Sequence, residues 1–441
     1  MRASARLLAS IALVAAPIGI AQAQVLPTTP ADSNDVSALP NRPAPERNDA
    51  RAQDRATQSL DPIGAHFGSF TAFPKIEGGL IYDSNIYGLE RETDDMIAKI
   101  SPSLTIQGDT GVYKGTLRVA LDRYQYFNRT LENRTDYAIG GNHSLEVAPE
   151  TFLTANGAFS FNHEDRGDPN ALATNLRPTE YYLYELGAGF ARDLSTFRVG
   201  LDGGFKRYDY NNARQIGGGI TNFQDRDRNQ YKVAGRAGFE FSPGYTFVAR
   251  AVWDKVDYDR KFNGQGFQRS SDGFRLSGGV GFELSQLLTG EVYGGWLRRN
   301  YDDARYPTIS KPLFGGALTW YPTELTTVNV NVDRSVDETL APGFSGYTTT
   351  SFSLNWTHEL TRTFQLNGGG RYGHLNYGLS SIGTVDRSDD TYGLNVGIRY
   401  ILNRNIYTSL GYDYSARQST AVGVGSDFKR HKVLATVGIQ M

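Results

Sequence analysis

The sequence predicts an all-β fold: a transmembrane up-and-down antiparallel β-barrel of about eighteen strands, with short periplasmic turns and longer extracellular loops. Three observations lead to this prediction. The chain starts with an export signal, apolar and polar residues alternate repeatedly over 72–441, and very short turns are interleaved with longer polar loops. Barrel strands are apolar on one face only, which keeps the mean hydropathy low, and here it is −0.43.

The first 23 residues have the order of a secretory signal peptide. Arg2 and Arg6 precede an apolar run over 7–20, and the small-residue motif that follows ends at Ala23. A positive start, an apolar middle and small residues at the cleavage point define such signals. The run is too short, and too interrupted by proline and glycine, for a helix that crosses a bilayer. We therefore predict a signal peptide over 1–23.

Residues 24–71 are predicted to form a flexible periplasmic arm that leads into the barrel. Residues 24–60 are rich in proline, alanine and charged residues and contain almost no aromatic side chains. Such a segment cannot bury enough apolar surface to offset its loss of entropy on ordering. The whole chain has 45 basic and 47 acidic residues and no cysteine. The balance of charge gives no support for nucleic-acid binding. Because the chain has no cysteine, it cannot form disulfides, and its stability is expected to come from closed strand pairing.

Residues 72–441 are predicted to be the outer-membrane barrel, because the alternation has a period of two. In 231–241, for example, Tyr231, Val233 and Phe239 share one face, whereas Lys232 and Arg236 share the other. Lipid is expected to contact the first face and water the second. A soluble β-sandwich also alternates, but it seldom sustains strands of this length over so long a chain.

The chain ends support a location in the outer membrane with both termini in the periplasm. An even number of strands separated by short and long connections in turn returns the C-terminus to the side where the first strand begins. Aromatic residues gather at both ends of the strands, as expected at the two interfaces of a lipid bilayer. The last strand runs to Met441, as in substrates of the barrel assembly machinery, although a terminal methionine departs from the usual aromatic residue.

No residues suggest catalysis, a cofactor or a metal site. The six histidines are scattered, and neither a GxSxG nor an HExxH motif accompanies them. No cysteine or histidine spacing is typical of a metal site. The tightest cluster, over 163–165, opens a long loop, and we interpret it as a solvated strand end. The sequence therefore predicts a protein that is not an enzyme.

Charged residues on the polar face of the strands are the candidate pore-lining residues. At bilayer depth such charges must face water or one another. They support two interpretations: a wall held rigid by ion pairs, or a hydrated conduit in which arginines offer planar donors to carboxylates and sugar hydroxyls. The candidates are Lys114, Arg118, Asp122, Arg236, Glu240, Arg250, Arg275, Arg371 and Arg399.

Two motifs at the start of the barrel carry a family resemblance. A DP-G-x-x-x-GSF-x-x-x-P motif covers 61–74, and a YD-x-N-I motif covers 82–86. The segment resembles the β-barrel porin family of the β-barrel porin 2 type, which occurs in exopolysaccharide and capsule gene clusters of proteobacteria. The resemblance extends more diffusely over residues 60–441. It implies an outer-membrane barrel that helps to export a polysaccharide, with periplasmic polysaccharide-export and co-polymerase proteins as partners.

Export of an exopolysaccharide is therefore the first functional hypothesis. Export follows from the resemblance, whereas the residues themselves predict only a polar barrel. A general or solute-specific uptake porin is the first alternative, and a structural or adhesive surface barrel is the second. Uptake porins tend to fold a long loop into the pore, and the connections over 164–178 and 211–227 are long enough to do so.

Overall fold

The computed structural model describes residues 60–441, apart from 286, 338, 340–343, 380–385 and 421–426. The predicted signal peptide and most of the predicted arm lie outside the described residues. The first described strand, β1 (Ala65–Phe67), pairs with the start of the next strand. In the part of the chain that the structure describes, no helix is both long and apolar enough to cross a membrane.

Within the described residues, the main sheet has nineteen strands, and all of them except the three-residue β1 belong to one barrel wall. The wall strands of the first part of the chain are β2 (Phe70–Asp83), β3 (Asp95–Asp109), β4 (Tyr113–Tyr126), β5 (Arg134–Ala148), β6 (Thr151–His163), β7 (Glu180–Leu194) and β8 (Phe197–Tyr210). The strands of the middle part are β11 (Arg228–Ser242), β12 (Tyr245–Tyr258), β13 (Ser271–Ser285), β14 (Leu288–Tyr301), β15 (Ile309–Thr323) and β16 (Thr326–Asp337). The last strands are β17 (Phe344–Glu359), β18 (Phe364–Leu379), β19 (Ser388–Asn403), β20 (Ile406–Ser419) and β21 (Phe428–Gln440).

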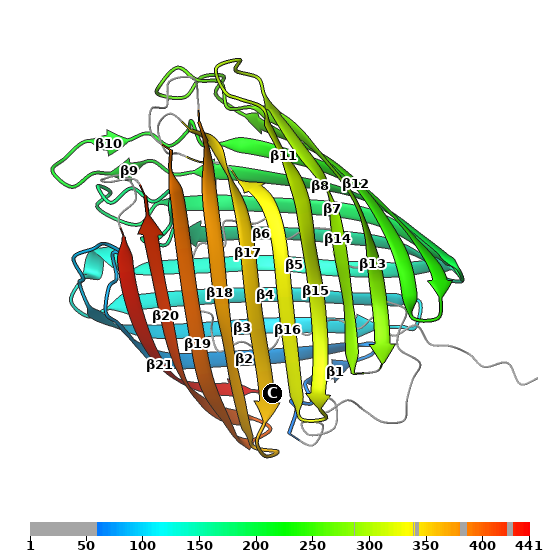
Figure 1. Cartoon of the computed structure of the whole chain (residues 1–441). Coiled ribbons are helices and arrows are strands. Elements are labelled where there is room, and N and C mark those ends of the chain that lie inside the picture. The colour runs from blue at the N-terminus through cyan, green and yellow to red at the C-terminus, as the bar shows by residue number, and fades with distance from the viewer. Residues whose placement is uncertain (1–59, 286, 338, 340–343, 380–385, 421–426) are drawn as a thin grey trace, which may run out of the picture.

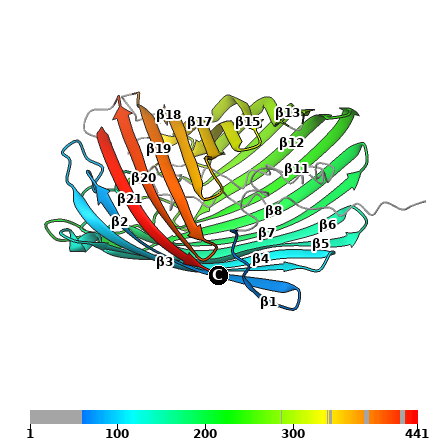
Figure 2. The ribbon, with the colours of Figure 1, turned by 90° about the horizontal axis from the view of Figure 1, so that it is seen from below.

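The wall closes on itself, as Figures 1 and 2 show from two directions. Each wall strand pairs antiparallel with the next wall strand along the chain, and β8 pairs with β11 because β9 and β10 lie in the loop between them. The seam is formed by β2 and β21, which pair from Lys75 opposite Gln440 to Asp83 opposite Lys432. In a closed barrel every strand has a hydrogen-bonded neighbour on both sides, so no backbone N–H or C=O group is left without a partner in the hydrocarbon of the bilayer. The predicted fold class is confirmed.

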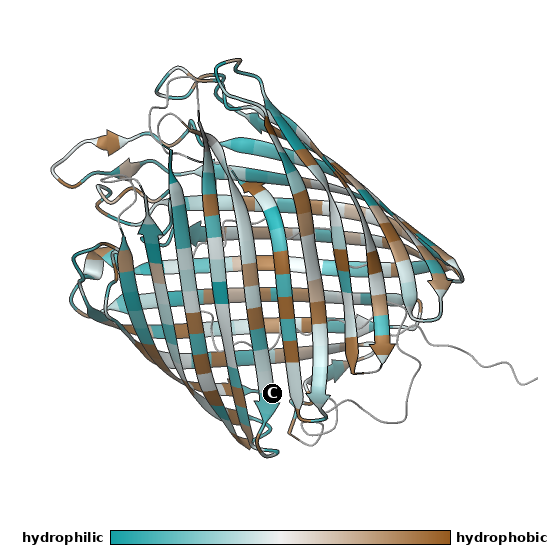
Figure 3. Cartoon of the chain, viewed as in Figure 1, coloured by the Kyte–Doolittle hydropathy of each residue, from teal (hydrophilic) through white to brown (hydrophobic). Residues whose placement is uncertain are grey.

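Alternation along the strands separates an apolar outer face from a polar inner face. On β11, Tyr231 and Val233 are 41% and 47% exposed, whereas Ala234 and Arg236 are 1% and 8% exposed. Figure 3 shows the same banding of apolar and polar residues along the strands. The exposed apolar side chains form the surface that contacts lipid. The predicted period of two is thereby confirmed on this strand.

Short and long connections lie at opposite ends of the barrel, which we name the turn rim and the loop rim. At the turn rim, Gly244 adopts φ +79° in the turn between β11 and β12, a conformation that glycine takes without strain. In another turn, the Ser195 N–H donates to Asp193 Oδ1 at 3.1 Å. The loop rim holds small elements too short to give a sequence period: η1 (Thr130–Glu132), β9 (Ala213–Arg214) and β10 (Ile220–Thr221).

Buried apolar side chains form small clusters on the inner face near the loop rim. One cluster joins Ile81, Ile97, Tyr126 and Leu434, which come from four strands around the seam. Soluble domains usually have one contiguous core. Here the clusters lie where the connections of the loop rim pack against the inside of the wall.

Candidate functional site

The nine candidate residues share the inner face of the wall. Residues paired directly across two strands point to the same side of a sheet, so the register links them from strand to strand. Arg236 lies opposite Arg250, and Arg250 lies opposite Ser277, two residues from Arg275. The opposite face carries the exposed apolar side chains. By their register, the residues on the inner face include Lys114, Arg118, Asp122, Arg236, Glu240, Arg250, Arg275, Arg371 and Arg399.

Two of these arginines share one carboxylate. Arg236 Nη2 lies 2.7 Å from Glu291 Oε2, and Arg250 Nη2 donates to the other oxygen of Glu291. The Arg250 guanidinium also lies 5.0 Å from the centre of the Tyr293 ring. Glu291 belongs to β14, so the carboxylate reaches past β13 to arginines on β12 and β11. This group links three strands of the wall, β11, β12 and β14.

Most of the other candidates also have a charged or aromatic partner. Burying a charge is costly unless it is paired, and pairing fixes the side chain in one place. The contacts are Asp122 with Lys99 (2.9 Å), Lys114 with Asp109 (3.7 Å), Glu240 with Arg198 (3.7 Å), Arg371 with Asp413 (3.9 Å) and the Arg399 guanidinium with the Tyr407 ring centre (3.8 Å). These contacts favour the interpretation of a wall held rigid by ion pairs.

Arg118 differs from the other arginines among the candidates. Its side chain is exposed on the inner face of β4, and within the described part of the chain it forms no ion pair. An exposed guanidinium keeps all five of its N–H donors available to water or to a solute. The free energy of folding therefore depends little on Arg118, whereas the electrostatic potential inside the barrel depends on it directly.

A second group of residues lies on the connection over 164–179, which we name the inward loop. The sequence indicated that this connection is long enough to fold into the pore, but it did not indicate the residues that hold it there. This loop joins β6 to β7, yet Arg430 on β21 donates from Nη1 to Asp165 Oδ1 at 2.9 Å. Arg417 on β20 donates from Nη1 to the Gly167 carbonyl at 3.0 Å. Along the wall, β5, β4, β3 and β2 separate β6 from β21. The loop therefore crosses the inside of the barrel instead of projecting away from it.

The predicted solvated strand end at 163–165 is wrong. Glu164 is only 9% exposed, and Arg226 from the connection over 211–227 donates to both of its carboxylate oxygens. The Arg226 guanidinium lies 3.9 Å from the centre of the Tyr210 ring. Because the inward loop folds against this arginine, water is displaced and the carboxylate is neutralised by a partner from a distant part of the chain.

The pKa values of Asp165 and Asp168 on the inward loop are shifted in opposite directions. Burial by itself would raise the pKa of Asp165, but Arg430 and Lys432 beside it hold the pKa below its ordinary value. For Asp168, burial together with the nearby Glu164 outweighs the opposing effect of Arg226 and raises the pKa to about 7. The Asn170 N–H donates to Asp168 Oδ1 at 2.7 Å, which opposes this rise. The loop therefore holds one firmly ionised and one readily protonated carboxylate.

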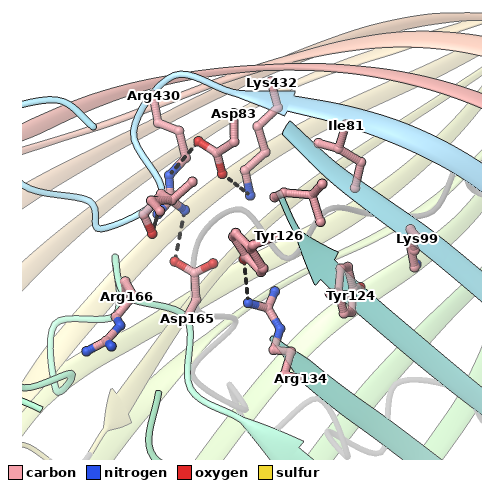
Figure 4. Close-up of a pocket in the computed structure, with 12 residues that line it drawn as sticks. Ile81, Asp83, Lys99, Tyr124, Tyr126, Arg134, Asp165, Arg166, Arg430 and Lys432 are labelled. Atoms are coloured by element: carbon pink, nitrogen blue, oxygen red, sulfur yellow. Dashed lines mark hydrogen bonds and ion pairs between the residues drawn. The ribbon is translucent and has the colours of Figure 1, made fainter. Parts of the chain in front are cut away.

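A small pocket lies beneath the inward loop, and Figure 4 shows the side chains around it. Asp83 lies 3.5 Å from Lys432 Nζ, and Arg134 Nη1 donates to the Tyr126 hydroxyl at 2.8 Å. Ile81 contributes to the apolar part of its lining. The cations thus engage protein partners, which fix the loop. Over the described ranges, no group of histidine, aspartate and glutamate side chains forms a metal site.

One sequence signal did point to this region. Asp83 and Asn85 belong to the YD-x-N-I motif, and both are buried here. Asn85 Nδ2 donates to the backbone carbonyls of Leu89 and Lys429 at 2.7 and 2.9 Å. The backbone carbonyl of Asn85 accepts from Arg430 Nε at 2.6 Å. The motif therefore binds the start of the first loop to the last strand, next to the residues that hold the inward loop.

Three solved structures resemble this chain at low sequence identity. The siderophore receptor PirA from Acinetobacter baumannii is 7% identical, with a TM-score of 0.43 over 84% of this chain and 80% of the receptor. The outer membrane protein OpdK from Pseudomonas aeruginosa is 12% identical, with a TM-score of 0.43 over 84% of this chain and 99% of OpdK. The ferric citrate transporter FecA is 11% identical, with a TM-score of 0.47 over 82% of this chain and 63% of FecA. No curated protein matches the sequence.

One family model covers the barrel and the segment that leads into it. The family is described as "Putative beta-barrel porin 2", and its model matches residues 58–441. The matched range contains both motifs of the sequence resemblance and every strand of the wall. The family predicted from those motifs is thereby confirmed. The chain therefore belongs to the beta-barrel porin 2 family and is an outer-membrane barrel of the porin type.

Proposed function

We infer that this porin-type barrel passes an exopolysaccharide outward across the outer membrane without catalysing a reaction. The polar inner face of the wall is the observation that carries this proposal. A barrel of about eighteen strands is wide enough for an aqueous channel. Charged, hydroxyl and amide side chains on its inside can hydrogen-bond a hydrated polymer weakly enough for the polymer to move on. The sequence motifs, which resemble proteins from exopolysaccharide gene clusters, support this choice of cargo.

The orientation belongs to the same proposal. Outer-membrane barrels have short turns on the periplasmic side and longer loops outside. We therefore assign the turn rim and both chain termini to the periplasm and the loop rim to the cell surface. Periplasmic polysaccharide-export and co-polymerase proteins would then deliver the polymer to the turn rim. The barrel assembly machinery would insert the chain by its last strand.

The candidate residues have two different roles in this pathway. Arg118 is exposed and offers its donors to carboxylates or hydroxyls of a passing polymer. Arg236 and Arg250 are held by Glu291 and keep the wall rigid. Only side chains of the first kind are expected to change what passes without changing how well the barrel folds.

A solute-specific uptake porin is the second candidate function, and the inward loop favours it. A loop that crosses the interior narrows the passage, which suits selection of a small solute. The bound conformation of this loop rests on the ion pair between Asp165 and Arg430, whose side chains are 12% and 2% exposed. For a polymer to be exported, the channel would have to pass beside the inward loop, or the inward loop would have to move out of the interior.

A deletion strain separates the two functions. Under the export proposal, cells that lack this protein lose surface polysaccharide while growth on small sugars stays normal, because other porins still admit nutrients. Supplying the wild-type gene on a plasmid restores the polymer. Normal surface polysaccharide in the deletion strain, together with slow growth on one small solute, would make the protein an uptake porin instead.

A further inference from the structure

Four asparagines on β16–β19 form an uncharged polar patch on the inner face of the wall. In register, Asn331 lies opposite Ser353, which lies opposite Arg371. In the next row, Asn355 lies opposite Gly369, which lies opposite Asn395. Asn367 follows two residues before Gly369 on β18. We name Asn331, Asn355, Asn367 and Asn395 the amide patch.

These amides are not used to hold the barrel together. Within the described part of the chain, none of the four side chains makes a hydrogen bond or another polar contact. Asn331 and Asn355 are exposed, and the other two are half-buried. By contrast, the nearby Asn329 accepts a hydrogen bond from Thr319 Oγ1 at 2.9 Å. The amide patch therefore presents its donors and acceptors to the interior of the barrel.

The side-chain amides of Asn355 and Asn395 both extend over Gly369, which has no side chain. A Cβ atom added at Gly369 would lie 2.6 Å from Asn355 Oδ1 and 3.3 Å from Asn395 Nδ2. Neighbouring strands are about 4.8 Å apart, so strands on either side of β18 are about 10 Å apart at the backbone. An amide oxygen and an amide nitrogen thus stand side by side above Gly369.

We propose that the amide patch is a subsite for the hydroxyl groups of a sugar ring. Each amide has two N–H donors and an oxygen acceptor, and a hydroxyl group both donates and accepts. Adjacent hydroxyls on a pyranose ring can therefore engage Asn355 and Asn395 together. The four side chains carry no charge, so a neutral sugar unit fits them better than an ion does. This inference rests on the proposed function and names the chemistry that contacts the polymer.

The subsite is tested by calorimetric titration of maltohexaose, a neutral glucose oligosaccharide, into the purified barrel in detergent micelles. The variant Asn355→Leu/Asn395→Leu keeps similar side-chain volumes and removes both amides. We expect it to weaken binding about tenfold or more, because hydrogen bonds from two side chains are lost. Gly369→Ala should weaken binding as well, since the added methyl group would lie 2.6 Å from Asn355 Oδ1 and 2.8 Å from the Leu354 carbonyl oxygen, so that both must shift.

Asn376→Leu is the matched control. It removes an amide from the outer face of the same strand, β18, and should bind maltohexaose as the wild type does. Folding of every variant is checked by its heat-modifiable migration on a gel. Equal affinity of the double variant and the wild type would overturn the proposal, and so would a wild-type barrel that does not bind maltohexaose.

A cell assay separates failure of the subsite from failure of the proposed function. Suppose the deletion strain loses surface polymer but Asn355→Leu/Asn395→Leu binds sugar normally. The subsite is then rejected and export stands. Suppose instead that the double variant loses binding while the deletion strain secretes normally. Export is then rejected and the sugar subsite stands.

Discussion

Arginines on the inner face of this barrel differ in exposure and in whether they pair with a carboxylate, and we expect different roles for the two kinds. Arg236 is 8% exposed and is bound to Glu291, whereas Arg118 is exposed and has no acidic partner in the described chain. A buried charge that loses its partner is costly, while an exposed charge is solvated with or without one. The alternation in the sequence predicts that both arginines lie on the polar face, but it does not predict which carboxylate, if any, each arginine binds.

Charge reversal at these two positions should have different consequences. Arg118→Glu is expected to shift the selectivity of the open pore toward cations, because fixed wall charge sets the local counter-ion concentration. Arg236→Glu instead places a second carboxylate beside Glu291 and should lower the free energy of unfolding by about 3–5 kcal/mol. Reversal potentials in planar bilayers and urea unfolding check the two results. Unchanged selectivity in Arg118→Glu would mean that this side chain does not face the ion path.

Asp168 should make binding of the inward loop depend on pH. Its pKa of about 7 in the folded protein lies above the value of about 3.9 for an unfolded aspartate. The unfolded loop therefore ionises first, and the bound loop loses stability as the pH rises from about 4 to about 7. The loss can reach about 4 kcal/mol, since each unit of difference corresponds to about 1.4 kcal/mol.

Hydrogen exchange of the amides over 164–179, corrected for intrinsic rates, measures this effect. Protection should fall between pH 5 and pH 8 in the wild type. Asp168→Asn cannot ionise, so its protection should stay constant and exceed that of the wild type at pH 8. A wild-type loop with the same protection at both pH values would show that Asp168 keeps an ordinary pKa.

The inward loop is an element whose conformation depends on arginines from distant strands. Arg430 and Asp165 are separated by 265 positions in the sequence, and their side chains are 2% and 12% exposed. Arg417 holds the Gly167 carbonyl from the neighbouring strand. Loops at the rim of a barrel are usually solvated, so this loop keeps its place only while the buried charges are matched.

Removing the arginine should release the loop. Arg430→Ala leaves Asp165 buried without its main partner, which is expected to cost about 3–5 kcal/mol. The double variant Asp165→Ala/Arg430→Ala should cost less than the sum of the two single variants, since no charge is then stranded. Urea unfolding gives the three free energies. Single-channel conductance should rise in Arg430→Ala as the loop leaves the interior.

Lys255→Ala is a suitable control for this cycle, because Lys255 is exposed on the outer face of β12. It should leave both the free energy of unfolding and the conductance close to those of the wild type. Additive costs of Asp165→Ala and Arg430→Ala would contradict direct coupling between the two side chains.

At the scale of the whole molecule, the strands could be predicted from the sequence because their signal is local. Alternation over 231–241 sets Tyr231 outside and Arg236 inside, and the register then carries that choice to every neighbouring strand. The short turns and long loops fix the number of strands. The closure of β2 on β21 follows from the requirement that no edge is left open in lipid.

The position of the inward loop could not be predicted in the same way. Its polar composition is equally compatible with water outside the barrel, and the arginines that bind it lie on β20 and β21. The length of the connection over 164–178 indicated that it could enter the pore, and the YD-x-N-I motif carried the family resemblance, but neither identified the residues that hold the loop. The pairing within the wall was also hidden, since alternation places Glu291 on a face but says nothing of which arginines it reaches.

The orientation of the barrel gives the last prediction, because the chain has no cysteine and single cysteines can be placed at either rim. Gly218 and Lys261 are exposed at the loop rim, and Ser242 and Thr323 are exposed at the turn rim. In whole cells, an impermeant thiol reagent should label cysteines at the first two positions only. After the outer membrane is permeabilised, all four should react, which shows that each thiol is accessible. Labelling at Ser242→Cys or Thr323→Cys in intact cells would place the short turns outside and reverse the assigned direction of transport.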